Sequence, residues 1–233
     1  MFETVLFLDS AGQPCQNFTT YFNENIVLDP KKKYKIALIN AFLWHSWFNV
    51  TENNNIFVYK KAGRTFMITI PPGAYNIPDL NNAIKQFSNT EGVTIEPNYN
   101  TLRCKITLAA GYEIDFTHER SLRHLLGFKS RLVTESGDGD LSVDITSVHS
   151  LLIRCSLVTG SFINGTSSDV LYSFTPNKPP GSLLHISPNQ SIYLPLAQNN
   201  LISAISISIT DQSGNLVDFR GEQATFFLSL KEI

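Results

Sequence analysis

Histidine is the side chain best suited to metal binding and acid–base catalysis near neutral pH, and this 233-residue sequence contains five. No two of them form an HxH, HxxH or HExxH pattern, the spacings that bring two imidazoles onto one metal ion. His118 and His124 flank one helical segment, but a spacing of six places them on different helical faces. We therefore expect structural or surface roles for all five, and no catalytic, cofactor-binding or metal-binding residue. The five are His45, His118, His124, His149 and His185.

Carboxylates two positions apart occur in the segment Glu135-Ser-Gly-Asp138-Gly-Asp140, and such a pair can converge on a hard cation such as Ca²⁺. The segment supplies fewer oxygen ligands than an EF-hand loop. Gly137 and Gly139 do not make it a phosphate-binding loop, because the neighbouring acids would repel a phosphate. We expect a flexible, solvated loop over residues 134–142, and the sequence leaves open whether residues 135–140 bind an ion.

A second acidic segment runs from Asp211 to Glu222, and a glycosidase-like carboxylate pair could be built from its two Asp and one Glu. Its first part, Asp211-Gln-Ser-Gly-Asn215, has the composition of a turn. We expect a hairpin turn followed by a strand on which Arg220 and Glu222 share one face and can pair. The chain has no GxSxG, P-loop or GxGxxG motif, so we expect that it is not an enzyme and needs no cofactor.

The three cysteines are far apart and form no CxxC pair, which gives no reason to expect a zinc site. Cys104 and Cys155 lie within apolar stretches, which indicates buried thiols. Together with Cys15 they make an odd number, which argues against an extracellular disulfide framework.

The N-terminal residues and the lengths of the apolar stretches predict a soluble intracellular protein. Residues 1–9 lack both the basic region and the long apolar run of a signal peptide. No apolar stretch reaches the roughly 18 residues that a membrane span needs, so we expect no membrane span. We expect the chain to be made as a soluble intracellular protein without a signal peptide.

The balance of charge gives no field that would attract a phosphate backbone. The chain has 18 Lys and Arg against 20 Asp and Glu, for a net charge of −2. The longest basic run, Lys31–Lys33, follows a proline and is interpreted as a solvated turn, with a nucleic-acid or nuclear-targeting patch as the alternative. We expect no direct contact with nucleic acid.

Short strands separated by turns dominate the sequence. The clearest alternation lies in residues 201–209, where Ile205, Ile207 and Ile209 should face a core and Ser206 and Ser208 should face outward. The apolar stretch 34–50 is too long for one ordinary strand, so we expect a bend or bulge in it. A hairpin is predicted around Lys61-Ala-Gly-Arg64, and Phe226, Leu228 and Leu230 alternate near the C-terminus. Further strands are expected at 5–8, 56–60, 65–70, 93–96, 102–108, 112–116, 148–158, 170–174, 183–186, 192–196 and 225–230.

Two helical segments interrupt the strands. Ile77, Leu80, Ile84 and Phe87 recur at spacings of three and four, which predicts a helix over roughly 77–88 with Asn76 as its N-cap. A shorter helical segment is predicted within residues 119–128. Gly127 lies where a C′ glycine would end it.

About twelve short strands, with two helices confined to connections, predict an all-β protein. Turn signals every eight to twelve residues favour an antiparallel β-sandwich, and a single jelly roll fits that pattern. There is no internal repeat and no segment long enough to be a linker, so we expect one jelly-roll domain over residues 1–233.

A series of short motifs follows a fixed order along the chain. They are Gly73-Ala-Tyr75 with the helix to Ile84, Ile114–Thr117, Ser121-Leu122, Leu126–Phe128, Ser161–Gly165, Leu171–Phe174, Pro188, Tyr193–Pro195, and Asp211-Gln212 through Arg220-Gly221-Glu222. The series resembles the penton-type minor capsid proteins of polintons (Mavericks) and adintoviruses, and copies of those genes in animal genomes. The resemblance that these motifs carry covers most of the chain, from about residue 34 to the end.

This resemblance implies a single jelly-roll vertex protein of an icosahedral virion. It implies homopentamers at the fivefold vertices, each surrounded by double jelly-roll major capsid subunits. The chain departs from many capsid proteins in one respect: it starts almost directly on a strand and has no long basic N-terminal arm. That departure weakens any expectation that the protein touches the genome.

Three bulky aromatic residues, Trp44, Trp47 and Phe48, crowd one segment and cannot all face the same side of a strand. Either some are exposed or covered by a partner, as aromatics at interfaces are, or all three enter the core through a bulge. Two other functions stay open. One is a jelly-roll carbohydrate- or ligand-binding module that stacks sugars on exposed aromatics. The other is a β-sandwich enzyme, which is disfavoured because no convergent acid, base and nucleophile set is visible.

Overall fold

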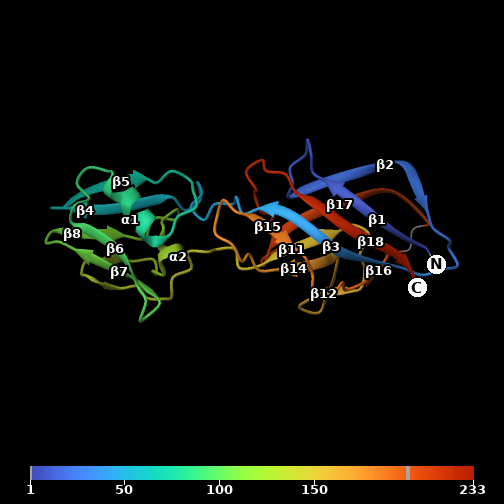
Figure 1. The fold of residues 1–233 in the computed structure, drawn as a ribbon. Helices are drawn as coiled ribbons and strands as arrows, with labels where there is room; N and C mark the ends of the chain where they lie inside the picture. The colour runs from blue at the N-terminus through green and yellow to red at the C-terminus, as the bar shows by residue number, and fades with distance from the viewer. Residues whose placement is uncertain (1, 198–199) are drawn as a thin grey trace. The chain divides into compact units, whose positions relative to one another are not determined.

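Apolar side chains gather into two separate cores in the computed structural model, which describes residues 2–197 and 200–233. Figure 1 shows the helices and strands that the chain forms. Unit 1 comprises Met1–Trp47 and Val148–Ile233, and unit 2 comprises Phe48–Ser147. This division differs from the single domain expected over residues 1–233. Unit 2 is inserted into unit 1, and the chain passes between them twice without a long polar linker, so composition alone does not mark the boundary.

Unit 1 is a sandwich of two antiparallel sheets. Sheet A has the strand order β1-β18-β3-β15, with β16 also paired to β3, and sheet B has the order β14-β11-β17-β2. The strands are β1 (Glu3–Asp9), β2 (Asn17–Val27), β3 (Tyr34–Trp44), β11 (Leu151–Cys155), β14 (Val170–Phe174), β15 (Leu183–Ile186), β16 (Leu194–Pro195), β17 (Leu201–Asp211) and β18 (Thr225–Glu232). A short hairpin of β12 (Ser161–Ile163) and β13 (Thr166–Ser168) lies between β11 and β14.

The order in which the chain visits the two sheets is that of a jelly roll. The chain alternates between sheets A and B from β1 to β11, places β11 and β14 side by side, and then alternates again to β18. This is the connectivity of a Greek-key sandwich with four principal strands in each sheet. The predicted fold class, an all-β jelly roll with short helices in its connections, is confirmed.

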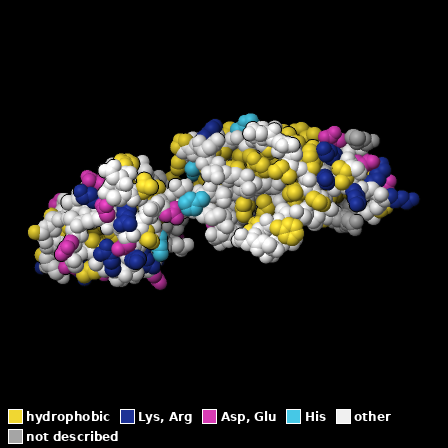
Figure 2. All heavy atoms as spheres, turned by 90° about the horizontal axis from the view of Figure 1, so that it is seen from below, with side chains coloured by type: hydrophobic (Ala, Val, Ile, Leu, Met, Phe, Trp, Pro, Cys, Tyr) yellow, Lys and Arg dark blue, Asp and Glu magenta, His cyan; other side chains and the backbone are white. Residues whose placement is uncertain are grey.

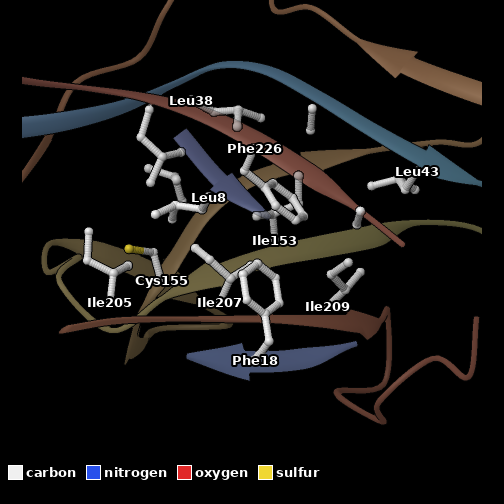
Figure 3. Close-up of a cluster of buried hydrophobic side chains, with 14 of the residues drawn as sticks. Leu8, Phe18, Leu38, Leu43, Ile153, Cys155, Ile205, Ile207, Ile209 and Phe226 are labelled. Carbon is white, nitrogen blue, oxygen red and sulfur yellow. The ribbon is translucent and has the colours of Figure 1, made fainter. Parts of the chain in front are cut away.

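The core of unit 1 lies between the sheets (Figure 3). Ile205, Ile207 and Ile209 on β17 point inward and are fully buried, as the alternation predicts. They belong to one cluster with Phe226 and Leu228 of β18 in the facing sheet. Burying one side chain of this size contributes about 1.5–3 kcal/mol relative to leaving it in water.

The long apolar stretch 34–50 bends as predicted. Phe227 pairs with Asn40 and Leu228 pairs with Leu38, so Ile39 is an extra residue on β3 opposite β18. This β-bulge changes the side-chain alternation of β3 midway. The strand then ends at Trp44, and the rest of the stretch is irregular.

Unit 2 also contains two small sheets, ordered β5-β4-β8-β9 and β10-β7-β6, around its own core. Its elements are β4 (Ile56–Lys61), β5 (Arg64–Thr69), α1 (Ile77–Lys85), β6 (Val93–Asn98), β7 (Arg103–Leu108), β8 (Tyr112–Asp115), α2 (Arg123–Leu126), β9 (Leu132–Val133) and β10 (Gly137–Asp138). The predicted hairpin joins β4 to β5 through Ala62 and Gly63, both at positive φ, as a tight two-residue turn requires.

Both helices form where the sequence predicts them. In α1 the Asn76 side chain accepts a hydrogen bond from the Asp79 N–H at 2.8 Å, and Ile77, Leu80 and Ile84 are buried. The helix ends at Lys85, three residues earlier than expected. In α2 the terminating residue is Gly127 with φ of 73°, the left-handed conformation that favours glycine.

Three local predictions differ from the structure. Residues 137–138 form β10, paired with β7, where a flexible loop was expected over 134–142. No strand forms within residues 217–224, so the strand expected after the turn at 211–215 is absent from this described segment. The sequence analysis also misses β2, because its Asn, Thr and Glu residues dilute the apolar alternation.

Candidate functional site

The histidines of unit 1 are engaged in packing and hydrogen bonds. His45 is buried, its Nδ1 lies 2.7 Å from the Lys178 carbonyl oxygen, and its ring stacks on Trp47 with 4.0 Å between centroids. His185 stacks on Phe42 with 4.6 Å between centroids. These contacts position apolar neighbours and do not direct imidazoles toward a shared ligand.

The remaining histidines are also tied to nearby backbone or side chains. His118 Nδ1 accepts the Arg120 N–H at 3.1 Å, and His124 Nε2 accepts from Arg123 Nε at 3.2 Å. The backbone N–H of His149 donates to Gln212 Oε1 at 3.1 Å. Within residues 2–197 and 200–233, no group of three or more His, Cys, Asp or Glu side chains is placed to share a metal ion.

The carboxylates of the segment 135–140 fix neighbouring turns. Asp138 Oδ2 accepts from Asn98 Nδ2 at 3.0 Å and from Thr101 Oγ1 at 3.1 Å, which ties β10 to the β6–β7 turn. Asp140 Oδ2 accepts from the Lys129 N–H at 2.9 Å and from Arg131 Nε at 3.1 Å. The hydrogen bond from the Lys129 N–H is the largest cause that lowers the pKa of Asp140, and the hydrogen bond from Arg131 lowers this pKa further. Asp138 and Asp140 therefore accept hydrogen bonds from different parts of the protein, and their structural role is to hold the neighbouring turns in place.

The second acidic segment also forms turns. Asp211 Oδ1 accepts the N–H groups of Ser213 and Asn215 at 2.8 and 2.9 Å, and Gly214 adopts a φ of 87°. Arg220 lies 3.2 Å from Asp218 Oδ2 and itself has a positive φ. The expected strand carrying Arg220 and Glu222 on one face is therefore replaced by two successive turns.

All three cysteines are buried free thiols, as predicted for Cys104 and Cys155. Burial disfavours the thiolate, and it raises the pKa to about 12 for Cys15 and Cys104 and about 11 for Cys155. At neutral pH these side chains remain protonated, so they are poor nucleophiles and poor metal ligands.

The residues that stand out on unit 1 are apolar side chains on the outer surface of sheet A. Alternation along four paired strands places them there, because their neighbours Leu8, Leu43 and Phe226 face the core. We call this set the aromatic face: Val5, Phe7, Phe42, Trp44, Leu183, His185 and Phe227.

Ring contacts connect the aromatic face across the sheet. Phe7 meets Phe227 edge-to-face with 4.8 Å between centroids, and Phe227 meets Phe42 at 6.0 Å. Phe42 then stacks on His185. The sequence contains a signal for this surface: Val5–Leu8 and Phe226–Leu228 are continuous apolar runs, which are typical of strands that are apolar on both sides.

The same outer surface becomes polar toward the end of the strands where β1 begins. Tyr193 lies over it, and its hydroxyl is 3.1 Å from Ser229 Oγ. Lys231 Nζ lies 3.5 Å from the centre of the Tyr193 ring, a cation–π contact. Lys231 pairs across strands with Lys35 on one side and Glu3 on the other, so this end carries charge.

The three crowded aromatic residues differ in their burial, because β3 contains a bulge and ends at Trp44. Trp47 is buried in the core of unit 1, Trp44 is exposed within the aromatic face, and Phe48 is half-buried. The expectation that part of this group is exposed is confirmed, and the alternative in which all three enter the core is wrong.

A space-filling view from another side of the molecule shows hydrophobic and charged side chains in separate areas (Figure 2). Hydrophobic side chains gather over the middle of unit 1, and basic and acidic side chains are concentrated over unit 2 and at the end of unit 1 that holds both termini. Monomeric proteins rarely leave large contiguous apolar areas in water, so such surfaces indicate contact with other molecules. In the described part of the chain, neither helix is long and apolar enough to cross a membrane.

Comparison with known proteins finds similarity only in three dimensions. No model of a known protein family matches the sequence, and no curated protein matches it. The fold is similar to the crystal structure of the mavirus penton protein, with a TM-score of 0.52 and 10% sequence identity. The similarity covers 100% of both chains, so it includes the insertion as well as the jelly roll. At this level of identity it shows a shared fold.

Proposed function

We propose that this chain is a structural capsid protein, a penton-like minor capsid subunit that forms homopentamers at icosahedral vertices. Its expected partners are four further copies of itself and a double jelly-roll major capsid protein, and its expected location is the capsid vertex of a virion. The observation that carries the proposal is the likeness to a penton protein over the full length of both chains. The ordered motifs that resemble polinton and adintovirus pentons support the same assignment.

The surface of unit 1 supports an assembly role over a catalytic one. The aromatic face is an apolar surface spread over four strands, and interface cores are enriched in aromatic side chains. The residues that could do chemistry are engaged in turns, packing and backbone hydrogen bonds. We propose that the protein acts by binding other subunits, and that catalysis is not its function.

The mass of the purified chain in solution tests this proposal. Five copies of the 26.1 kDa chain form a particle of about 130 kDa. Light scattering over a concentration series should show that mass, and electron microscopy should show fivefold rings. A chain that is monomeric at every concentration, forms no rings, and does not co-assemble with a double jelly-roll capsid protein would contradict the proposal.

A second candidate function is binding of carbohydrate or another ligand by unit 2. Tyr99, in the turn between β6 and β7, is 80% exposed, and Asp138 fixes that turn through Thr101 and Asn98. An exposed ring on a fixed turn can stack against a sugar. A glycan array with the native chain and the Tyr99→Ala variant tests it: binding that requires Tyr99, by a chain that does not assemble, would favour this function.

A further inference from the structure

A second exposed apolar patch lies on the opposite side of the sandwich from the aromatic face. Tyr21 and Val27 of β2 and Leu201 of β17 are 77, 73 and 50% exposed. Val27 and Leu201 are directly paired, and Tyr21 pairs with Ala204, which lies three residues further along β17, beyond a register shift. Their neighbours Ile202 and Ile205 face the core, so the three side chains lie on the outer surface of sheet B. We call them the β2 patch.

Beside the β2 patch the outer surface of sheet B is mainly polar, and its polar groups bond to one another; Leu152 of β11 and Val170 of β14 are half-buried apolar residues on the same surface. Thr19 Oγ1 lies 2.8 Å from Ser206 Oγ, and Ser156 Oγ accepts the Ser206 N–H at 3.0 Å. Arg154 pairs with Asp169 at 2.7 Å. The β2 patch is therefore a localised apolar area on a hydroxyl-rich surface, small enough to dock against one feature of a partner.

Charges of opposite sign lie near the two surfaces, and the exposed basic run Lys31–Lys33 follows the end of β2. Glu24 is exposed and lies between Tyr21 and Val27 on β2, in a part of β2 that is not paired with β17. Beside the aromatic face, Lys35 and Lys231 outnumber Glu3. Strand directions place both sets toward the same end of the sandwich, because β1 and β17 begin there and β2 and β18 end there. Copies standing side by side with aligned strands would bring opposite charges together.

We propose that the aromatic face of one subunit binds the β2 patch of the next copy of this chain, with Glu24 opposite Lys35 and Lys231. A closed ring requires heterologous contacts, in which one flank of a subunit fits the opposite flank of its neighbour. The outer surfaces of sheets A and B are such opposite flanks. This inference rests on the proposed pentamer and specifies the two surfaces that form it.

Two exposed residues test the two surfaces separately. Phe7→Asp alters the aromatic face and Tyr21→Asp alters the β2 patch, and each places a charge in an interface that should be apolar. Both side chains are largely exposed, so each variant should fold. Phe162→Asp is the matched control, because Phe162 is 69% exposed, similar to Phe7 at 67%, and lies on the β12–β13 hairpin outside both surfaces. Circular dichroism confirms folding of all three.

Light scattering on the full-length chains should show pentamers for the native protein and Phe162→Asp, and monomers for Phe7→Asp and Tyr21→Asp. An equimolar mixture of the two monomeric variants should then form a 1:1 dimer of about 52 kDa, twice the 26.1 kDa chain. Each variant retains one intact surface, and the two intact surfaces fit each other. No ring can form from that mixture.

The charge pairing has its own test. Glu24→Lys should raise the dissociation constant of the pentamer about tenfold or more at low salt, because it places like charges opposite each other. Adding Lys35→Glu in the same chain should recover most of the lost affinity. Pentamers that survive both Phe7→Asp and Tyr21→Asp would overturn this inference while leaving the proposed function in place. The inference is also overturned if the mixture yields no dimer or if only one of the two surfaces matters. A native chain that assembles neither alone nor with a double jelly-roll capsid protein would overturn both.

Discussion

At the scale of single residues, the side-chain alternation of a strand decides which groups are buried. On β17 the isoleucines at 205, 207 and 209 are fully buried, and the intervening serines are only partly covered. Neighbouring residues on a strand face opposite sides of the sheet, so a shift of register by one would exchange the two sets. The polar groups that seemed able to do chemistry are used locally instead, as the turn formed by Asp211 shows.

The alternation on β17 predicts opposite outcomes for two adjacent substitutions. Ile207→Ala should lower the free energy of unfolding of unit 1 by about 2–5 kcal/mol, because it leaves a cavity in the core. That is a large part of a total of about 5–15 kcal/mol. Ser208→Ala should change it by less than about 0.5 kcal/mol.

Urea denaturation followed by tryptophan fluorescence measures both variants, because one of the two tryptophans, Trp47, belongs to the same core as Ile207. If Ser208→Ala proved more damaging than Ile207→Ala, the strand assignment in this region would have to be abandoned.

Hydrogen bonds from Lys61 and Tyr112 in unit 2 lower the pKa of the Glu91 carboxyl group. Lys61 Nζ lies 2.5 Å from Glu91 Oε1, and the Tyr112 hydroxyl donates to the same oxygen at 3.0 Å. The Lys61 bond is the largest cause that lowers the pKa of Glu91 from 4.5 to about 2. A carboxyl whose pKa is lowered by folding stabilises the fold above its unfolded pKa, and that contribution is lost as the pH falls toward 2.

Titration of Glu91 by carboxyl-carbon NMR measures this pKa directly. Lys61→Met should raise it toward 4.5, and Tyr112→Phe should raise it less, because Lys61 makes the larger contribution. An unchanged pKa in Lys61→Met would show that the contact does not persist in solution.

At the scale of elements, residues at the ends of helices and hairpins determine where each element stops. Asn76 begins α1 by satisfying a free N–H, and Gly127 ends α2 in a left-handed conformation. Gly127 also has a second constraint: a Cβ atom there would collide with the backbone carbonyl of Leu141. This glycine therefore sets both the end of α2 and the path of the segment before residue 143.

Alanine substitutions at two glycines of unit 2 separate two costs to stability, that of a left-handed backbone conformation and that of a steric clash with the added Cβ atom. Gly63, in the β4–β5 turn, has a φ of 78° and no atom within 4 Å of an added Cβ. Gly63→Ala should therefore cost only about 1–2 kcal/mol, the cost of a left-handed non-glycine residue. Gly127→Ala has a similar φ and should cost clearly more, because backbone atoms of residues 141 and 142 must move.

Hydrogen exchange of amides in β7 and β8 measures the stability of unit 2 in both variants. Equal costs for the two substitutions would mean that the segment at residues 141–142 can move away freely, contrary to the packing described here.

At the scale of the whole molecule, the jelly roll has an insertion of about a hundred residues between β3 and β11. The two ends of the insertion are held together. Asn49 Nδ2 donates to the Ile145 carbonyl at 2.6 Å and to the Tyr75 carbonyl at 2.7 Å. Because unit 2 has its own core and adjacent ends, it has the features of a domain inserted into another.

We therefore expect residues 48–147 to fold when expressed alone. The fragment should show the β-sheet circular dichroism and the dispersed NMR spectrum of an ordered protein, with slow exchange in β4, β6 and β7. Asn49→Ala in the same fragment should lower its stability, because one side chain joins both ends. An unfolded fragment would indicate that unit 2 requires unit 1, and would favour the single domain expected from the sequence.

The sequence by itself determined the local properties of this protein. Period-two alternation identified β17 and β18, period-3.6 alternation identified α1, and glycine identified the ends of turns, because these signals depend on neighbouring residues alone. It also determined that Cys104 and Cys155 are buried thiols.

Only the tertiary structure decided features that depend on residues far apart in the chain. A mostly polar strand such as β2 exists because β17 supplies its hydrogen-bond partners. The aromatic face exists because β1, β18, β3 and β15 pair in that order and bring Phe7, Phe227, Phe42 and His185 together. The separation of two cores likewise follows from packing. Strand pairing is determined by the whole chain, so no local pattern could specify which strands lie side by side.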